Sequence, residues 1–565
     1  MEKRKNTFMN NVAAILGSQF LIKLLGLAYN LIIINIPGFG DAGNGYRTAG
    51  YQIYTMLLAI SSVGIPNAIS KMVSERLALD DREGAERIFR TALALFAGIG
   101  LAASLLLYWG ADFIALTVVK MDGVQLTLRA LSPSIFFVCI SSVIRGWFLG
   151  RQNVSPNNRS QLLEQIFKAA LTVVFVLALS DYTAAVMAAG ANAATAVSTA
   201  LSCGYLVIVL LLYRRKNKCP RPTALSKGGR RAICRQILSL SVPISLSAII
   251  TTVSRVIDTA TISRGISAAF AEGIPGQAGI PTEAQLQAYA VQLNGMLNKA
   301  DNITNLPLAL NIAFATVLVP TISAALAVGD RRTASKKISY SFLISTLIIL
   351  PCAAGLIVLA EPFFKLLYPN ASQGADILRL ASVALIFTAL DQTINGSLQG
   401  LGRVKVPAQG LLCGAVVKLI LNLILIRIPA INVYGAAISS VACHMVAFAI
   451  CFTSLRRAIP LKMKRTKYFT KPLLCTLFMS VVTWGSYRLA MLAFRSNLVA
   501  VVLSVALSVA AYFAAVFGLH ILNKREVLEL PMGARIARLL KLYGRMSGAR
   551  GMLHCSIPFF FAQNY

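Results

Sequence analysis

The chain has 565 residues, of which 56% are hydrophobic and only 13% are charged, and its mean hydropathy is +0.69. A soluble protein of this length would form roughly three or four domains, and soluble surfaces carry about 25–35% charged side chains. The composition therefore excludes a secreted enzyme, a disordered chain and a disulfide scaffold. It predicts an all-helical integral membrane protein, because membrane spans need long apolar segments.

Basic residues dominate the charge: 54 Lys and Arg against 21 Asp and Glu give a net charge of +33. Such an excess in a soluble protein would suggest a nucleic-acid partner, but here the cations lie between apolar segments, as membrane topology requires. The ten cysteines form no CxxC pair and lie mostly within apolar segments, which is typical of reduced, buried thiols. We expect no nucleic acid, no metal and no cofactor.

Fourteen apolar segments follow one another along the chain, each long enough for the roughly 20 residues of a membrane span. The first is too long for the roughly 7–15-residue apolar core of a signal peptide, so we expect it to be retained. Lys and Arg are about four times more frequent in one set of alternate loops, which predicts that both termini are cytoplasmic. The predicted spans lie near residues 8–34, 49–72, 89–114, 128–149, 160–180, 184–213, 237–263, 300–328, 337–360, 376–400, 405–426, 432–455, 470–492 and 497–522.

A basic segment with several breakers separates the sixth and seventh predicted spans, and it predicts a cytoplasmic linker between two lobes. The longest external segment, residues 265–292, contains closely spaced Gly and Pro and predicts irregular backbone, either a lid or a connector. The predicted organisation is an N-terminal six-helix lobe (1–213), the linker (214–235), a C-terminal six-helix lobe (236–457), two further transmembrane helices (458–523) and a basic cytoplasmic tail (524–565).

The two lobes repeat each other in sequence. The segment Arg145–Gly150 ends the fourth span and Asn395–Gly400 ends the tenth, at the same offset that relates Lys168 to Lys418. Equivalent spans are six apart, so both copies cross the membrane in the same direction. Such parallel repeats occur in transporters whose substrate site lies between the halves, which predicts two lobes around a central cavity.

Enzyme signatures are mostly absent, since the chain has no GxxxxGK[ST] loop, no HExxH motif and only three histidines. Ionisable residues at membrane depth are costly and mark functional sites. Lys23 lies near the middle of the first span, where it either contacts a ligand or extends to the membrane surface. Arg255 and Asp258 lie on one face of the seventh span, where they either neutralise each other or line a cavity.

Other charged residues lie in or near the spans. We expect Lys168 to form an interfacial ion pair with Glu164, whereas Lys418 lies deeper, with Asn422 one turn further on. Asp391 either bridges helices or binds a proton or an ion.

Lys299 and Asp301, at the external start of the eighth span, are expected to form an exposed, solvated pair. A cleft lined by cations suits an anionic ligand such as a phosphate, because a Lys or Arg attracts phosphate strongly at low dielectric. Acyl tails on that ligand would remain in the lipid.

Three motifs resemble those of a known family. They are Gly64–Glu75, the Arg145–Gly150 segment with residues 161–164 after it, and Asn305–Pro307 followed by 319–323. Together with fourteen predicted spans they are similar to the oligosaccharide flippases of the MOP superfamily, in particular the Gram-positive MurJ-like and stage V sporulation protein B group. The resemblance implies a multi-pass protein of the bacterial cell membrane that moves lipid II, a polyprenyl-pyrophosphate-linked precursor, to the outer leaflet by alternating access.

The same resemblance implies which residues bind the pyrophosphate. Lys23 matches a cavity-facing cation of the first span in a basic-x-x-Gly pattern. In the eighth span Asp301 is kept, while Asn302 replaces an Arg. Arg47, Lys299 and Arg255 are the cations available to compensate.

Some relatives bind sodium through acids on spans 7 and 11, and Asp258 matches the first of these. Span 11 carries Lys418 and Asn422 instead, so we hypothesise that the Lys418 ammonium stands where the ion would be. The driving force is then either a sodium ion or the membrane potential.

Alternative functions remain open from the sequence. One is a drug/cation antiporter of the same superfamily, and another is a flippase for a different lipid-linked polysaccharide. A membrane glycosyltransferase would need an external catalytic acid, for which Glu272, Glu283 and Glu361 are available. A pure scaffold gives no reason for Lys23 at mid-membrane depth.

Overall fold

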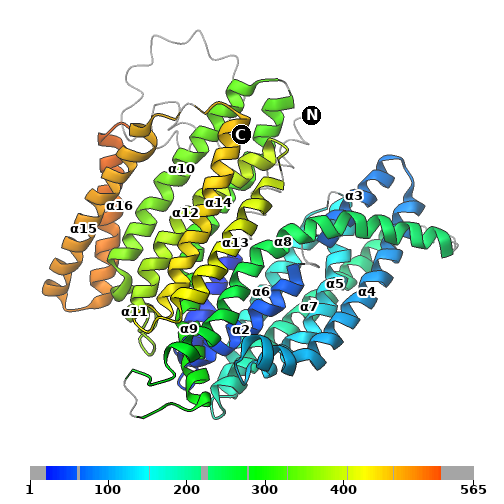
Figure 1. The fold of residues 1–565 in the computed structure, drawn as a ribbon. Helices are drawn as coiled ribbons and strands as arrows, with labels where there is room; N and C mark the ends of the chain where they lie inside the picture. The colour runs from blue at the N-terminus through cyan, green and yellow to red at the C-terminus, as the bar shows by residue number, and fades with distance from the viewer. Residues whose placement is uncertain are drawn as a thin grey trace, which may run out of the picture.

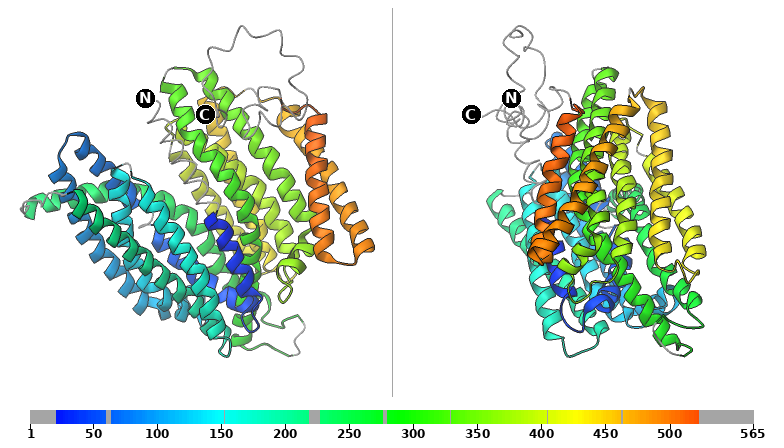
Figure 2. Two further views of the ribbon diagram at one scale, coloured as in Figure 1. Left: turned by 180° about the vertical axis from the view of Figure 1, so that it is seen from behind. Right: turned by 90° about the vertical axis from the view of Figure 1, so that its left-hand side faces the viewer.

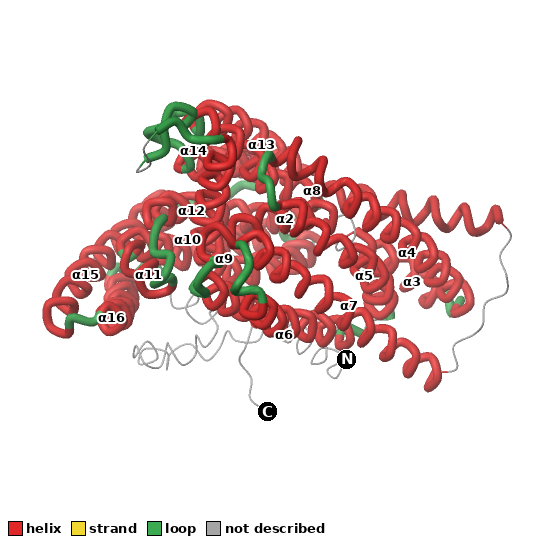
Figure 3. Tube along the Cα trace, turned by 90° about the horizontal axis from the view of Figure 1, so that it is seen from below, coloured by secondary structure: helices red, strands yellow, loops and turns green. Residues whose placement is uncertain are grey.

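The computed structural model describes residues 21–59, 64–151, 153–217, 227–275, 279–327, 329–403, 405–461 and 463–522. These residues form helices joined by loops and turns, and they contain no strand (Figure 3). Ten of the described helices are long and apolar enough to span a membrane. The predicted all-helical membrane fold is confirmed, whereas the predicted count of fourteen spans is not.

The first lobe contains the helices that correspond to the first six predicted spans, shown in blue to cyan in Figure 1. Its second predicted span is formed by two helices on either side of residues 60–63. The helices of this lobe are Leu21–Ile34, α2 (Gly40–Ala59), α3 (Ile65–Ala78), α4 (Arg82–Phe113) with the π-helical extension η2 (Ile114–Val119), α5 (Val124–Gly150), α6 (Ser155–Ala178) and α7 (Ala184–Asn217).

The second lobe, green to yellow, is followed by an orange helix pair at its outer side (Figures 1 and 2). Much of the predicted linker is helical, because α7 extends to Asn217 and the next helix begins at Lys227. The last fifteen residues lie outside the described part. The helices are α8 (Lys227–Ala269), α9 (Glu283–Ala327), α10 (Arg331–Val358), α11 (Ala360–Leu367), α12 (Ala375–Gly400), α13 (Lys405–Leu425), α14 (Tyr434–Ala458), η3 (Thr466–Thr470), α15 (Lys471–Phe494) and α16 (Asn497–Gly518).

Helix packing follows the sequence repeat. In the first lobe α5 packs against α4 and α7, and α7 packs against α6. In the second lobe α12 packs in the same way against α10 and α14, and α14 packs against α13. Equivalent helices therefore have equivalent neighbours, as expected for two copies of one six-helix unit.

The repeat extends to the capping of single helices. Asp81 caps α4 by accepting a hydrogen bond from Gly84 N (2.7 Å), and Asp330 caps α10 by accepting one from Thr333 N (2.9 Å). Such carboxylate caps satisfy backbone N–H groups that lack a partner within the helix. The residue before each cap, Asp80 or Gly329, has a positive φ, which ends the preceding helix. Two similar turns thus start α4 and α10, which correspond to the third predicted span of each lobe.

The two lobes meet at one end and diverge at the other (Figure 1). At the closed end α2 crosses α9 with two glycines between the backbones. A Cβ on Gly295 would lie 1.9 Å from the Asp41 carbonyl oxygen, and one on Gly45 would lie 2.0 Å from that of Val291. Asn44 Nδ2 donates to the Gly295 carbonyl (2.9 Å), and Asn294 Nδ2 donates to that of Gly45 (3.2 Å). Only residues without a side chain permit this contact.

We predict that Gly295→Ala destabilises the protein by about 1–3 kcal/mol, because the added methyl group overpacks the crossing of α2 and α9. Gly204→Ala is the matched control, since a Cβ at Gly204 in α7 meets nothing within 4 Å. Thermal unfolding of both purified variants in detergent measures the effect. Equal melting temperatures for the two would contradict a tight crossing.

Candidate functional site

A cavity of about 390 Å³ lies within the second lobe and is closed on one side by the first helix. Its walls come from α8, α9, α12, α13 and α14, and the helix Leu21–Ile34 contributes one residue. In Figure 2 that dark blue helix runs between the two lobes. The polar residues that line the cavity are Lys23, Ser254, Arg255, Asp258, Asp301, Thr304, Asn305, Thr388, Asp391, Gln392, Asn395, Lys418, Ser440 and His444.

Two of the lining cations are accessible. Lys23 and Arg255 both have exposed side chains, and neither pairs with a carboxylate of the described residues. Both residues line the same cavity. Two like charges held together without a direct counterion attract an anion into the space between them.

A buried ion pair forms the wall beside Arg255. Lys418 Nζ lies 2.6 Å from Asp258 Oδ2 and also donates to Ser254 Oγ (3.1 Å). Asn422 Nδ2 donates to Asp258 Oδ1 (3.0 Å) and to Thr261 Oγ1 (2.9 Å). Both carboxylate oxygens are therefore satisfied, as a buried charge requires. Asp258 pairs with Lys418 across two helices, so the alternative in which it neutralises Arg255 is wrong.

Acidic residues are also present, so the cavity is not lined by cations alone. Asp301 is half-buried and interacts electrostatically with Arg255, and Asp391 is 3% exposed. The described lining contains three acidic and three basic side chains, so their formal charges cancel. They differ in access, because Asp258 and Asp391 are buried while Lys23 and Arg255 are exposed. The accessible charge is therefore mainly positive.

Lys299 lies outside the cavity and is fully buried at the crossing of the lobes. Its ammonium pairs with Asp41 (2.6 Å) and donates to the carbonyls of Ala371 (2.5 Å) and Gln373 (3.0 Å). The rings of Phe364 and Tyr368 complete its surroundings, with centroids 5.3 and 5.4 Å away. The predicted exposed pair of Lys299 with Asp301 is wrong, because Lys299 is 0% exposed and pairs across the lobes.

Three further residues from the sequence analysis lie away from the cavity surface. Arg47 is buried and donates to Asn30 Oδ1 (2.7 Å) and Asn44 Oδ1 (2.9 Å). Asn302 donates to Asn298 Oδ1 (3.0 Å) and is not among the lining residues. The third is Lys168 of α6, which does not line the cavity.

The predicted ion pair between Lys168 and Glu164 is wrong. Lys168 Nζ donates to Tyr51 Oη (3.2 Å) and lies 4.3 Å from the centroid of its ring. Glu164 pairs instead with Arg145 (3.0 Å) on α5. The helix spacing of the two residues is suitable for a pair, but neighbouring helices supply better partners to both.

The sequence analysis named Asp391 but missed Asn395 and His444, which the fold brings into the same cavity. Asp391 Oδ1, Asn395 Oδ1 and His444 Nδ1 are buried and have no hydrogen-bond partner among the described residues. Asp391 and Asn395 are one turn apart on α12, a spacing that could have been noticed. His444 gives no such signal, because it comes from α14 and only tertiary packing brings it near.

Comparisons with known proteins agree with this architecture. A family model described as "Polysaccharide biosynthesis protein" matches residues 8–326, and one described as "Lipid II flippase MurJ" matches residues 294–492. Stage V sporulation protein B of Bacillus subtilis (strain 168) is 23% identical over 94% of this chain and 99% of its own length. Lipid II flippase MurJ of the same organism is 25% identical over 78% of this chain and 80% of its own length.

Solved structures show the same fold. An inward closed conformation of lipid II flippase MurJ superposes with a TM-score of 0.68 at 15% identity, covering 90% of this chain and 98% of that one. An inward-facing multidrug resistance MATE family transporter of the MOP superfamily superposes with a TM-score of 0.63 at 18% identity, covering 79% and 97%. The resemblance inferred from the motifs is confirmed by these matches.

We predict that removing one partner of the Asp41–Lys299 pair costs about 3–5 kcal/mol, because the other charge is left buried and unpaired. Asp41→Asn and Lys299→Met test the single changes. The combined variant should recover part of the loss, since no buried charge remains. Chemical or thermal unfolding in detergent gives the coupling free energy.

The exposed pair Glu361–Lys365 is the matched control, with its atoms 2.7 Å apart on α11. Glu361→Gln should leave the free energy of unfolding unchanged, because water screens an exposed pair. An equal loss at both pairs would contradict the special role assigned to burial.

Proposed function

Because this chain belongs to the polysaccharide biosynthesis protein family, we propose that it moves a polyprenyl-pyrophosphate-linked cell-wall precursor, most specifically lipid II, from the inner to the outer leaflet. It is a transporter and not an enzyme. Relatives and structural neighbours that carry the names of flippases and transporters support this class of function.

One observation supports the anionic head group most directly: Lys23 and Arg255 are exposed in the same cavity without a carboxylate partner. A pyrophosphate between them would satisfy both charges with charge-assisted hydrogen bonds. Asp301 lines the same cavity and interacts electrostatically with Arg255, but forms no ion pair with it among the described residues. Arg47, Lys299 and Asn302 are left out of this proposed contact, because their polar atoms are used elsewhere.

An apolar groove on the other side of α9 suits the polyprenyl tail. It measures about 710 Å³ and is lined by residues of α10, α11, α15 and α16 together with Leu306 and Pro307 of α9. Thr304, Asn305 and Leu308 of α9 line the polar cavity. Only the thickness of one helix separates the two spaces, so a head group and its tail would occupy opposite faces of α9.

Alternating access is supported by the way in which the lobes meet. The closed end is held by the α2–α9 crossing, by Lys299 and by Asn35, which donates to the Leu367 carbonyl (2.8 Å). With both termini in the cytoplasm, as the distribution of Lys and Arg favours, the closed end is external. Transport then requires that these contacts break while the opposite ends of the lobes approach.

We also propose that Lys418 replaces a coupling cation at Asp258. The Lys418 ammonium lies 2.6 Å from Asp258 Oδ2, and Asn422 Nδ2 donates a hydrogen bond to Asp258 Oδ1. The site therefore needs no sodium ion for charge balance. In this proposal the membrane potential drives transport.

A second candidate function is a drug/cation antiporter. It is favoured by the buried Asp391, whose Oδ1 has no partner among the described residues, because such a carboxylate suits a proton or a cation. Expression in a strain that lacks its own efflux pumps distinguishes the two, since an antiporter would raise resistance to cationic drugs and a flippase would not.

The flippase proposal predicts that Lys23→Ala and Arg255→Ala each lower transport by about tenfold or more, because each removes a charge-assisted contact. The measurement is the amount of lipid II accessible at the outer leaflet of a bacterium that depends on this protein for transport. Lys71→Ala is the control, since Lys71 is exposed on α3 and pairs with Glu75. It should transport at the wild-type rate.

Well-expressed wild-type protein that moves no lipid II would contradict the choice of substrate. The same assay with another lipid-linked polysaccharide would then be tried. Full transport by both alanine variants, at equal protein level, would contradict the phosphate contact.

The proposal for Lys418 predicts that Lys418→Gln creates sodium dependence. Without the ammonium, Asp258 is left unpaired, and sodium should raise the melting temperature of the variant by about 2 °C or more relative to choline at equal ionic strength. Wild type should not respond. Lys168→Gln, at the equivalent position of the first lobe, is the control because its partner is Tyr51 rather than a carboxylate. A sodium response of the wild type would contradict the replacement.

A further inference from the structure

The first turns of α8 form a segment that differs from the spanning helices. Figure 1 shows that α8 begins by lying across the first lobe and then turns to run alongside the other helices. Pro243 lies within α8, and a proline inside a helix favours a bend. Residues 227–242 before this proline are called the transverse segment here. A helix that lies across the end of a bundle runs along the membrane surface.

The transverse segment is amphipathic. Ile233, Ile237 and Leu240 pack against the hydrophobic core of the first lobe, at the spacing of one helix face. The opposite side is exposed and carries Arg231 and Arg235. One face is therefore anchored to the protein, and the basic face is left uncovered.

The guanidinium groups on the exposed face are not used within the protein. Among the described residues, no carboxylate pairs with Arg231 or Arg235. Arg214, near the end of α7, differs from these two arginines. It pairs with Glu86, and its guanidinium lies 4.8 Å from the centroid of the Phe89 ring. The protein thus neutralises one cation of this region and leaves the others available.

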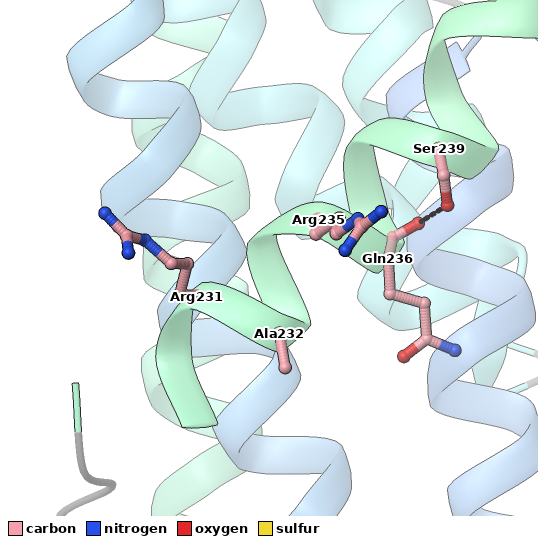
Figure 4. A pocket seen from close by; sticks show the side chains of 5 residues that line it. All are labelled: Arg231, Ala232, Arg235, Gln236 and Ser239. Carbon is pink, nitrogen blue, oxygen red and sulfur yellow. Dashed lines mark hydrogen bonds between the residues drawn. The ribbon is translucent and has the colours of Figure 1, made fainter. Parts of the chain in front are cut away.

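A shallow, open hollow of about 450 Å³ lies along the uncovered face, and its described lining residues all belong to α8. It is lined by Arg231 and Arg235, one turn apart, and by three small or uncharged residues. The Ser239 hydroxyl donates a hydrogen bond to the Gln236 carbonyl (2.9 Å) (Figure 4). The two arginines are the charged residues among those that line the hollow. The lining residues are Arg231, Ala232, Arg235, Gln236 and Ser239.

Two apolar side chains continue this exposed face. Leu238 and Val242 are 37% and 48% exposed, which is unusual next to arginines on a water-facing helix but suits the boundary between head groups and acyl chains. The combination of arginines and apolar side chains fits a lipid better than a soluble anion, because the acyl chains of a lipid can contact the apolar side chains and a soluble anion has no apolar part.

We propose that the transverse segment is a binding site for the phosphodiester head group of an anionic phospholipid, held by Arg231 and Arg235. The site is separate from the transport cavity and does not rest on the proposed substrate. The same helix supplies Ser254, Arg255 and Asp258 to the cavity wall, so a lipid bound at its start is attached to an element of the cavity.

The test is a titration of the full-length protein in detergent with dioleoyl phosphatidylglycerol, followed by native mass spectrometry. Phosphatidylcholine serves as the neutral lipid. We expect the wild type to bind the first phosphatidylglycerol more tightly than phosphatidylcholine, and R231Q/R235Q to weaken this binding by about tenfold or more, since each basic residue near a membrane surface contributes to the attraction of anionic lipid.

The matched control is R331Q/R332Q, which removes two exposed arginines from the start of α10. It should bind phosphatidylglycerol as the wild type does. Equal loss in both double variants, or equal binding of the two lipids by the wild type, would overturn the proposal. Displacement of phosphatidylglycerol by millimolar inorganic phosphate would overturn the assignment to a lipid. Unchanged melting temperatures confirm that the variants are folded.

Discussion

The buried ammonium of Lys299 constrains the whole molecule, because it lies on one lobe and its counter-charge lies on the other. Out of water, this cation needs Asp41 and the carbonyls of Ala371 and Gln373. The two carbonyls belong to its own lobe, whereas Asp41 lies on α2 and comes within reach where α2 and α9 touch at Gly45 and Gly295. The closed end of the transporter is therefore held by electrostatics and by backbone proximity at once, and the remaining helices diverge from it.

The charged residues of this chain divide by whether the protein satisfies them. Asp258 and Lys418, like Arg145 and Glu164, satisfy each other between helices and stabilise a lobe. Lys23 and Arg255 remain exposed in the cavity without such partners. Unpaired charge is costly within a membrane, and these are the two residues that the proposed function assigns to the substrate.

Two long helices connect the separate parts of the structure. α8 lies across the first lobe, bends and then lines the cavity, while α9 closes the lobes at one end and separates the polar cavity from the apolar groove along its length. Each of these helices contacts elements of both lobes.

The sequence by itself determined the membrane class, the helical repeat and the family motifs, because hydrophobicity and the spacing of equivalent residues are local or periodic properties. It also singled out Lys23, Arg255 and Lys418, since charges within apolar segments are conspicuous. Tertiary structure alone decided how these charges are paired: Asp258 joins Lys418 rather than Arg255, Lys299 is buried against Asp41 rather than solvated beside Asp301, and His444 enters the cavity from a distant helix. The reason is physical, because an ion pair forms between the nearest groups in space, and helix packing rather than sequence separation sets that distance.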